Sequence, residues 1–159
     1  MTCRVLLAAL ALLGAGATAT AHDLSGAPEA PRNALPPEVL QSVDLGNELP
    51  GMEGRSLRLR KVTLEPGGAI PPHSHVDRPA VVYILQGRVR EHRSDHDAPI
   101  EYGAGDSMTE SEALHHWIEN IGDEPLIGIV VDIPNEGGAE ALSEEEILRR
   151  AGRAPHRHD

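Results

Sequence analysis

Two histidines separated by one residue, His73 and His75, are the first feature of the sequence that could carry chemistry. Alternate residues of a β-strand point to the same face, so a strand here would place both imidazole rings in one space. A third histidine, His116, follows 41 residues after His75 in a strand-like segment. Three neutral imidazoles that converge form a site for a first-row divalent transition metal. Two solvated loop histidines are the alternative interpretation of the His73/His75 pair.

The segments around these histidines have the patterns of short strands. Leucine and arginine alternate from residue 57 to 60, and apolar residues continue this spacing up to the turn Glu65-Pro66-Gly67-Gly68. Residues 80–85 and 126–133 are apolar runs rich in β-branched side chains, and residues 88–93 form a polar strand. Further strands are expected at 100–102 and around 116–119. Many short strands with Gly and Pro between them predict an all-β sandwich or barrel.

Two stretches resemble the two conserved motifs of the cupin family. Residues 67–87, GGAIPPHSHVDRPAVVYILQG, match the first motif at Gly67, His73, His75 and Gly87. Residues 105–120, GDSMTESEALHHWIEN, match the second motif at Gly105, His116 and Asn120. The resemblance implies a double-stranded β-helix, the cupin jelly-roll barrel, with His73, His75 and His116 as metal ligands. His115 is not selected by the motif, and adjacent strand residues face opposite sides.

The sequence departs from the first cupin motif at its carboxylate ligand, because the motif glutamate falls at Ala80. Asp77 is the candidate substitute, since it shares a face with His73 and His75 if the strand continues that far. The alternative is that Asp77 pairs with Arg78 at the surface, because the following proline indicates a break in the strand. A three-histidine site, with or without Asp77, would bind Fe, Zn, Ni, Mn or Cu, and the ligand types do not select among them.

The function remains open between classes. Three-histidine cupins include thiol and diketone dioxygenases, so the resemblance implies a metal-dependent dioxygenase that acts on a small organic substrate. A non-catalytic module that binds a metal or a small ligand is the alternative, and a metal-free structural barrel is the third. The formal net charge of -11 argues against nucleic acid as a partner, because phosphate binding needs a basic face.

Residues 1–21 have the layout of a secretory signal peptide, with one arginine, an apolar run and small residues that end in Ala19-Thr20-Ala21. We expect cleavage between Ala21 and His22 and a periplasmic or secreted product. The apolar run, residues 5–13, is shorter than the roughly 20 residues of a spanning helix, so no membrane contact is expected after cleavage. Cys3 is the single cysteine of the chain, which excludes an intrachain disulfide.

The remaining chain divides into an N-terminal arm at 22–55, a cupin barrel at 56–135 and a C-terminal helix and tail at 136–159. Residues 22–37 are rich in Pro and Ala without a period, which predicts a flexible segment. Ser143 and Glu146 have capping-box spacing, so a short helix is expected directly after Ser143.

The strand predicted at 80–85 also indicates the oligomeric state of the protein. In the motif register its even-numbered residues face the barrel interior, which leaves Val81, Tyr83 and Leu85 outside. An exposed apolar face of this kind usually marks an interface. The chain's own ends could cover it, but the tail helix is too short to cover both apolar strands, so a two-fold homodimer is expected.

Overall fold

The computed structural model describes residues 24, 26–137, 142–150 and 152. The predicted signal peptide at 1–21, its predicted cleavage point and Cys3 lie outside the described residues. Within the described residues, no helix is both long enough and apolar enough to cross a membrane.

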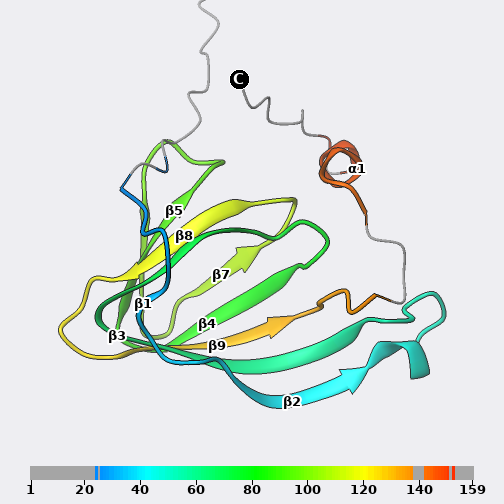
Figure 1. Ribbon diagram of the computed structural model, residues 1–159, viewed down its shortest axis with the longest axis horizontal. Helices are drawn as coiled ribbons and strands as arrows, with labels where there is room; N and C mark the ends of the chain where they lie inside the picture. Colours follow the sequence, from blue (N-terminus) through cyan, green and yellow to red (C-terminus); the bar gives the residue numbers. More distant parts are fainter. Residues whose placement is uncertain (1–23, 25, 138–141, 151, 153–159) are drawn as a thin grey trace, which may run out of the picture.

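The described residues form nine strands, wrapped into a barrel-like sheet, and two short helical segments (Figure 1). The strands are β1 (Arg32–Ala34), β2 (Glu38–Asp44), β3 (Ser56–Ser74), β4 (Ala80–Gln86), β5 (Arg88–Arg93), β6 (Ile100–Gly103), β7 (Ser107–Glu110), β8 (His115–Asn120) and β9 (Leu126–Asp132). The helical segments are the 3₁₀ turn η1 (Leu45–Asn47) and the helix α1 (Glu144–Arg150). The predicted all-β barrel with a short C-terminal helix is confirmed.

The sheet is folded over into two layers, and the long strand β3 runs through both of them (Figure 1). Its first part pairs with β2 and β9, and its second part pairs with β1 and β8. The sequence predicts a turn at 65–68, but the chain instead bends there without leaving the sheet. Gly67 has φ +69, and a Cβ on Gly68 would lie 2.7 Å from the carbonyl oxygen of Glu65. Two glycines are therefore needed where the strand passes from one layer to the other.

The segment predicted as an arm, residues 22–55, contains two strands of the sheet. β2 pairs antiparallel with β3 from Glu38 opposite Lys61 to Asp44 opposite Ser56, and β1 pairs with β3 further along. All seven residues of β2 are exposed, so main-chain hydrogen bonds hold it rather than side-chain burial. Hydrophobic periodicity therefore gave no signal for this strand.

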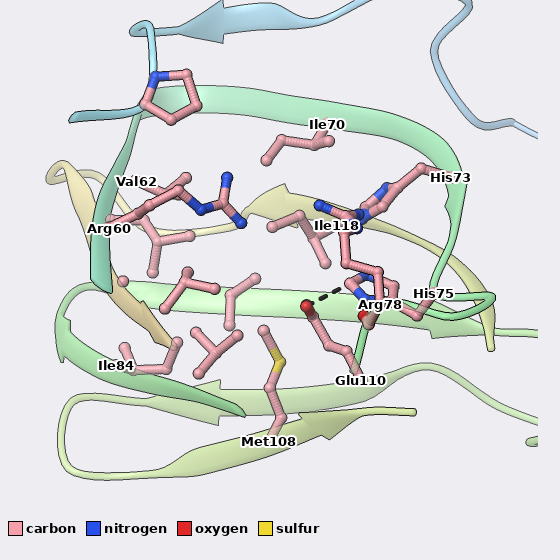
Figure 2. A pocket seen from close by; sticks show the side chains of 16 residues that line it. Arg60, Val62, Ile70, His73, His75, Arg78, Ile84, Met108, Glu110 and Ile118 are labelled. Atoms are coloured by element: carbon pink, nitrogen blue, oxygen red, sulfur yellow. Dashed lines mark hydrogen bonds and ion pairs between the residues drawn. The ribbon is translucent and has the colours of Figure 1, made fainter. Parts of the chain in front are cut away.

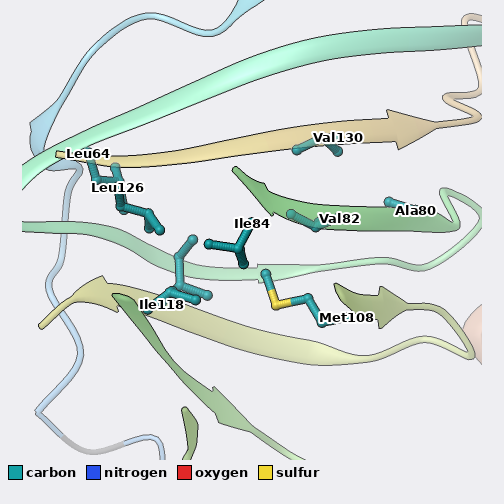
Figure 3. Close-up of a cluster of buried hydrophobic side chains, with 9 residues drawn as sticks. Leu64, Ala80, Val82, Ile84, Met108, Ile118, Leu126 and Val130 are labelled. Carbon is teal, nitrogen blue, oxygen red and sulfur yellow. The ribbon is translucent and has the colours of Figure 1, made fainter. Parts of the chain in front are cut away.

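The apolar core lies between the two layers and consists mainly of aliphatic side chains (Figure 3). Its buried members are Leu64, Ala80, Val82, Ile84, Val89, Met108, Ile118, Leu126 and Val130. Burial alternates strictly along the first six residues of β4, as the motif register predicts. One face of β4 therefore lines the interior, and the other faces outward.

Helix α1 docks at one end of the barrel. The N–H of Glu146 donates to Oγ of Ser143 (3.2 Å), as the predicted cap requires, whereas the Glu146 carboxylate binds Arg149 and Arg150. Leu148 is fully buried, and Ile147 lines a hollow shared with Pro79. The helix thus packs on the barrel end and not on the outer face of β4.

We expect the outer face of β4 to form a two-fold dimer interface. Val81, Tyr83 and Leu85 are 52%, 47% and 55% exposed, although α1 is already docked elsewhere. Light scattering should give twice the monomer mass, and Tyr83→Asp should shift the mass toward the monomer because the charge would be buried between the copies. The variant Leu49→Asp, at an equally exposed leucine of the turn after η1, should stay dimeric. A monomeric parent chain would contradict the prediction.

Candidate metal centre and adjoining cavity

The structure brings His73, His75 and His116 together through the pairing of β3 with β8. His73 lies opposite His116 in this ladder, and the N–H of His75, just beyond the end of β3, donates to the carbonyl of Leu114 (2.9 Å). Nε2 of His116 lies 3.1 Å from Nε2 of His73 and 3.1 Å from Nε2 of His75. One ring nitrogen from each histidine thus lies within 4.8 Å of the other two.

Hydrogen bonds on the far side of each ring fix the tautomers. Nδ1 of His73 faces the carbonyl of Pro71 (3.0 Å), and Nδ1 of His75 faces the carbonyl of Arg78 (3.0 Å). Nδ1 of His116 lies 2.6 Å from a carboxylate oxygen of Glu91. Each Nδ1 therefore carries the hydrogen, and each Nε2 directs a lone pair toward the other two.

Three converging lone pairs are the donor set of a transition-metal site. Nitrogen ligands about 2.1 Å from one ion, at about 90–110° to each other, stand roughly 3.0–3.4 Å apart. The 3.1 Å from Nε2 of His116 to Nε2 of His73 and to Nε2 of His75 matches that spacing. Without a cation, lone pairs at this distance repel each other. The residues present therefore fit a divalent transition metal.

Glu91, on β5, fixes the ring of His116 from behind. Its carboxylate is completely buried, accepts the Nδ1–H of His116 and is also bound by Arg93 (3.3 Å) and Tyr102. Burial by itself raises the pKa of Glu91, but the hydrogen bond from His116 and the charge of Arg93 outweigh it, so the pKa lies below its usual value. A charged carboxylate behind a ligating imidazole fixes the ring and raises its basicity.

Glu110, the last residue of β7, directs its carboxyl group at the same cluster. Oε2 lies 3.2 Å from Nε2 of His75, and Oε1 lies 3.5 Å from Nε2 of His116. Burial raises the pKa of Glu110, and the nearby His116 offsets this only in part. An inward-pointing carboxyl group beside two ring nitrogens is a fourth candidate ligand, and the sequence analysis missed it.

The structure does not bring Asp77 to the histidines. β3 ends at Ser74, and Asp77 lies in the following turn with φ +55, so the alternation assumed for a continuous strand does not reach it. Its Oδ1 binds Arg55, and its Oδ2 accepts a hydrogen bond from Asn135 (2.9 Å). The proposed alternative partner, Arg78, instead faces the inner cavity. Both oxygens of Asp77 are therefore engaged away from the cluster.

A cavity of about 210 Å³ extends from the histidine cluster into the barrel (Figure 2). Its polar end holds His73, His75, Arg78 and Glu110, and Arg60 enters from the other side with its guanidinium directed inward. The remaining wall is largely apolar and includes Val82, Ile84, Met108, Ile118, Leu126 and Val130. Such a space suits a small organic molecule next to a metal.

The family model for the cupin domain matches residues 60–132. This stretch contains the three histidines, Glu91 and Glu110. Residues 60–132 are a cupin domain. An uncharacterised double-stranded β-helix protein from Klebsiella pneumoniae shares the fold at a TM-score of 0.50 and 20% identity. That alignment covers 72% of the cupin described here and 87% of the Klebsiella chain.

Two other proteins are similar to parts of this cupin. Oxalate decarboxylase OxdC of Bacillus subtilis is 39% identical over 69 residues, which is 42% of this chain and 18% of the relative. A germin-like protein of Morus alba is 27% identical over 95 residues, which is 57% of this chain and 46% of the relative. This cupin thus spans less than half the length of either relative.

Glu110 lies next to the position at which the motif glutamate would stand. Ala80, where that glutamate falls, lies directly opposite Glu110 in the pairing of β4 with β7. Directly opposed residues place their side chains on the same side of the sheet about 5 Å apart. Ala80 and Glu110 are both 6% exposed and both inward. A carboxyl group from β7 therefore reaches the space that a side chain at Ala80 would enter.

We expect the metal-free chain to lose stability as the pH falls below about 6.5. Burial lowers the pKa of His73 to about 4 and that of His75 to about 3, so the unfolded chain takes up protons that the folded cluster does not. Each histidine then reduces the free energy of unfolding by up to about 1.4 kcal/mol per pH unit. Thermal unfolding of the chelator-treated chain between pH 7 and pH 5 measures this slope. A His73→Gln/His75→Gln variant should flatten the slope, and an equal slope in both chains would contradict the prediction.

Proposed function

We propose that this chain is an exported metal-binding cupin, in which His73, His75, His116 and Glu110 hold one divalent transition metal beside the cavity. The observation that carries the proposal is the convergence of three ring nitrogens, with Nε2 of His116 3.1 Å from each of the other two, on a point that Glu110 also faces. The relatives named above are consistent with a metal-binding cupin. This chain matches only 18% and 46% of their lengths, so the activity proposed below does not rest on them.

The hydrogen bonds behind the three imidazole rings support a site that is assembled before the ion binds. Glu91 holds His116, and two backbone carbonyls hold the other rings, so none of the three must turn to bind. Ligands held in their binding geometry lose little conformational freedom when the ion binds. The largely apolar wall beyond them limits the access of bulk water to the inner end of the cavity.

We further propose that the site performs dioxygenase-type chemistry on a small organic molecule. A bound transition metal supplies Lewis acidity and a site for oxygen or water at the polar end of the cavity. The chain supplies an enclosed space at that point, with Arg78 and Glu110 placed to contact a substrate or to move a proton. Oxygen uptake by the metal-loaded chain in the presence of candidate substrates distinguishes this enzyme from a non-catalytic binding module, which would bind ligand without consuming oxygen.

The ligand set is tested by metal affinity rather than by activity. Glu110→Gln should lower the metal affinity at least tenfold, because glutamine has the size of glutamate but carries no negative charge. Asp77→Asn should leave it unchanged, because both Asp77 oxygens are engaged elsewhere. Competition with a chromophoric chelator measures the affinity, and thermal unfolding of each variant checks its fold. Full metal content in a His73→Ala/His75→Ala double variant, or equal losses in the two carboxylate variants, would refute the assignment.

The export proposal is tested by the N-terminus of the mature protein. We expect the chain recovered from the periplasm or the medium to begin at His22. Signal peptidase cleaves after an Ala-x-Ala sequence, which Ala19 and Ala21 provide here. N-terminal sequencing gives the answer directly. Replacement of Ala21 by a bulky residue should block the processing, whereas a parent protein that starts at Met1 would contradict the proposal.

A further inference from the structure

Three arginines share a single buried carboxylate at the edge of the cavity. Asp132 on β9 is 1% exposed and accepts two hydrogen bonds from Arg58, at 3.0 and 2.9 Å. Nη2 of Arg60 donates to the same carboxylate at 2.8 Å, and Nη1 of Arg78 lies 3.7 Å from it. Arg58 engages both oxygens of Asp132, so Arg60 and Arg78 are only partly neutralised.

Two of these cations face the cavity that the histidines border. Arg60 and Arg78 both line it, together with His73, His75 and Glu110 (Figure 2). Nε of Arg60 is buried and has no hydrogen-bond partner among the residues that the structure describes. A buried N–H without an acceptor is destabilising, and a ligand oxygen could satisfy it. In a chain of net charge -11, this pocket is a local site of positive charge.

The rest of the wall is aliphatic and favours a ligand with an apolar part. Val82, Ile84, Met108, Ile118, Leu126 and Val130 surround the inner part of the cavity. Its volume of about 210 Å³ equals the share of roughly seven water molecules in the liquid, which suits a ligand of about seven to ten non-hydrogen atoms. The arginines would bind the anionic head of such a ligand, and the aliphatic side chains would contact its apolar body.

We propose that the cavity binds a small organic carboxylate, with its carboxylate on Arg60 and Arg78 and its apolar body against the aliphatic wall. Guanidinium groups bind carboxylates through paired hydrogen bonds, and both cations lie where such a head group would adjoin the histidine cluster. This substrate class rests on the proposed function, because it assigns the ligand of the same cavity. The apolar body distinguishes it from a dianion such as oxalate.

Calorimetric titration with hexanoate tests the proposal against two matched ligands. Hexanamide has the same size without the charge and should bind at least tenfold more weakly. Oxalate has the charge without the apolar body and should also bind more weakly than hexanoate. Equal affinity for hexanoate and hexanamide, or tighter binding of oxalate, would overturn the proposal.

Variants of the two cavity arginines provide a second test of the carboxylate site. Arg60→Met and Arg78→Met should each weaken hexanoate binding at least tenfold, and Asp132 keeps its paired contact with Arg58 in both. Arg88→Met is the matched control, because Arg88 is exposed and pairs with Glu101 outside the cavity. Unchanged hexanoate affinity in both cavity variants would overturn the proposal.

Metal content, measured in the same preparations, separates this proposal from the proposed function. A chain that binds metal but not hexanoate refutes the carboxylate site alone. Arginine-dependent binding of hexanoate by a chain that takes up no metal refutes the metal site and supports the carboxylate site.

Discussion

The antiparallel pairing of β3 with β8 is the constraint on which the candidate site depends. It sets His73 opposite His116, and it also fixes where β3 stops, so that His75 turns inward beside them. A shift of this pairing by one residue would move His116 to the outer face and bring His115 inward. The buried contact between His116 and Glu91 on β5 is available in the observed register and opposes such a shift.

The barrel interior separates into a polar end and an apolar end, and each buried acid of the polar end has its own set of partners. Glu91 is held by His116 and Arg93, whereas Asp132 is held by arginines. Glu110 differs, because it faces the Nε2 atoms of the cluster and its pKa is raised by burial. A carboxyl group with that environment gains most from a cation, while the other two are already neutralised.

Much of the fold follows from local sequence patterns, whereas the full site does not. Alternation along residues 80–85 predicts which face of β4 is buried, and the motif spacing predicts the histidine trio and not His115. Asp77 was misplaced because alternation cannot tell where a strand ends. Glu110 was missed because its closeness to Ala80 exists only through the pairing of β4 with β7. β2 escaped prediction because its residues are exposed on both faces.

The place of Glu110 on β7 has a dynamic consequence. β7 has four residues and, among the described strands, lies at the end of the sheet order with β4 as its neighbour. Short edge strands open at a lower free-energy cost than central ones, so β7 can separate while β3 and β8 stay paired. Such an opening would withdraw the proposed anionic ligand and leave the three imidazoles in place. The rate at which an ion leaves the site would then be set by the fraying of one strand edge, and not by unfolding of the barrel.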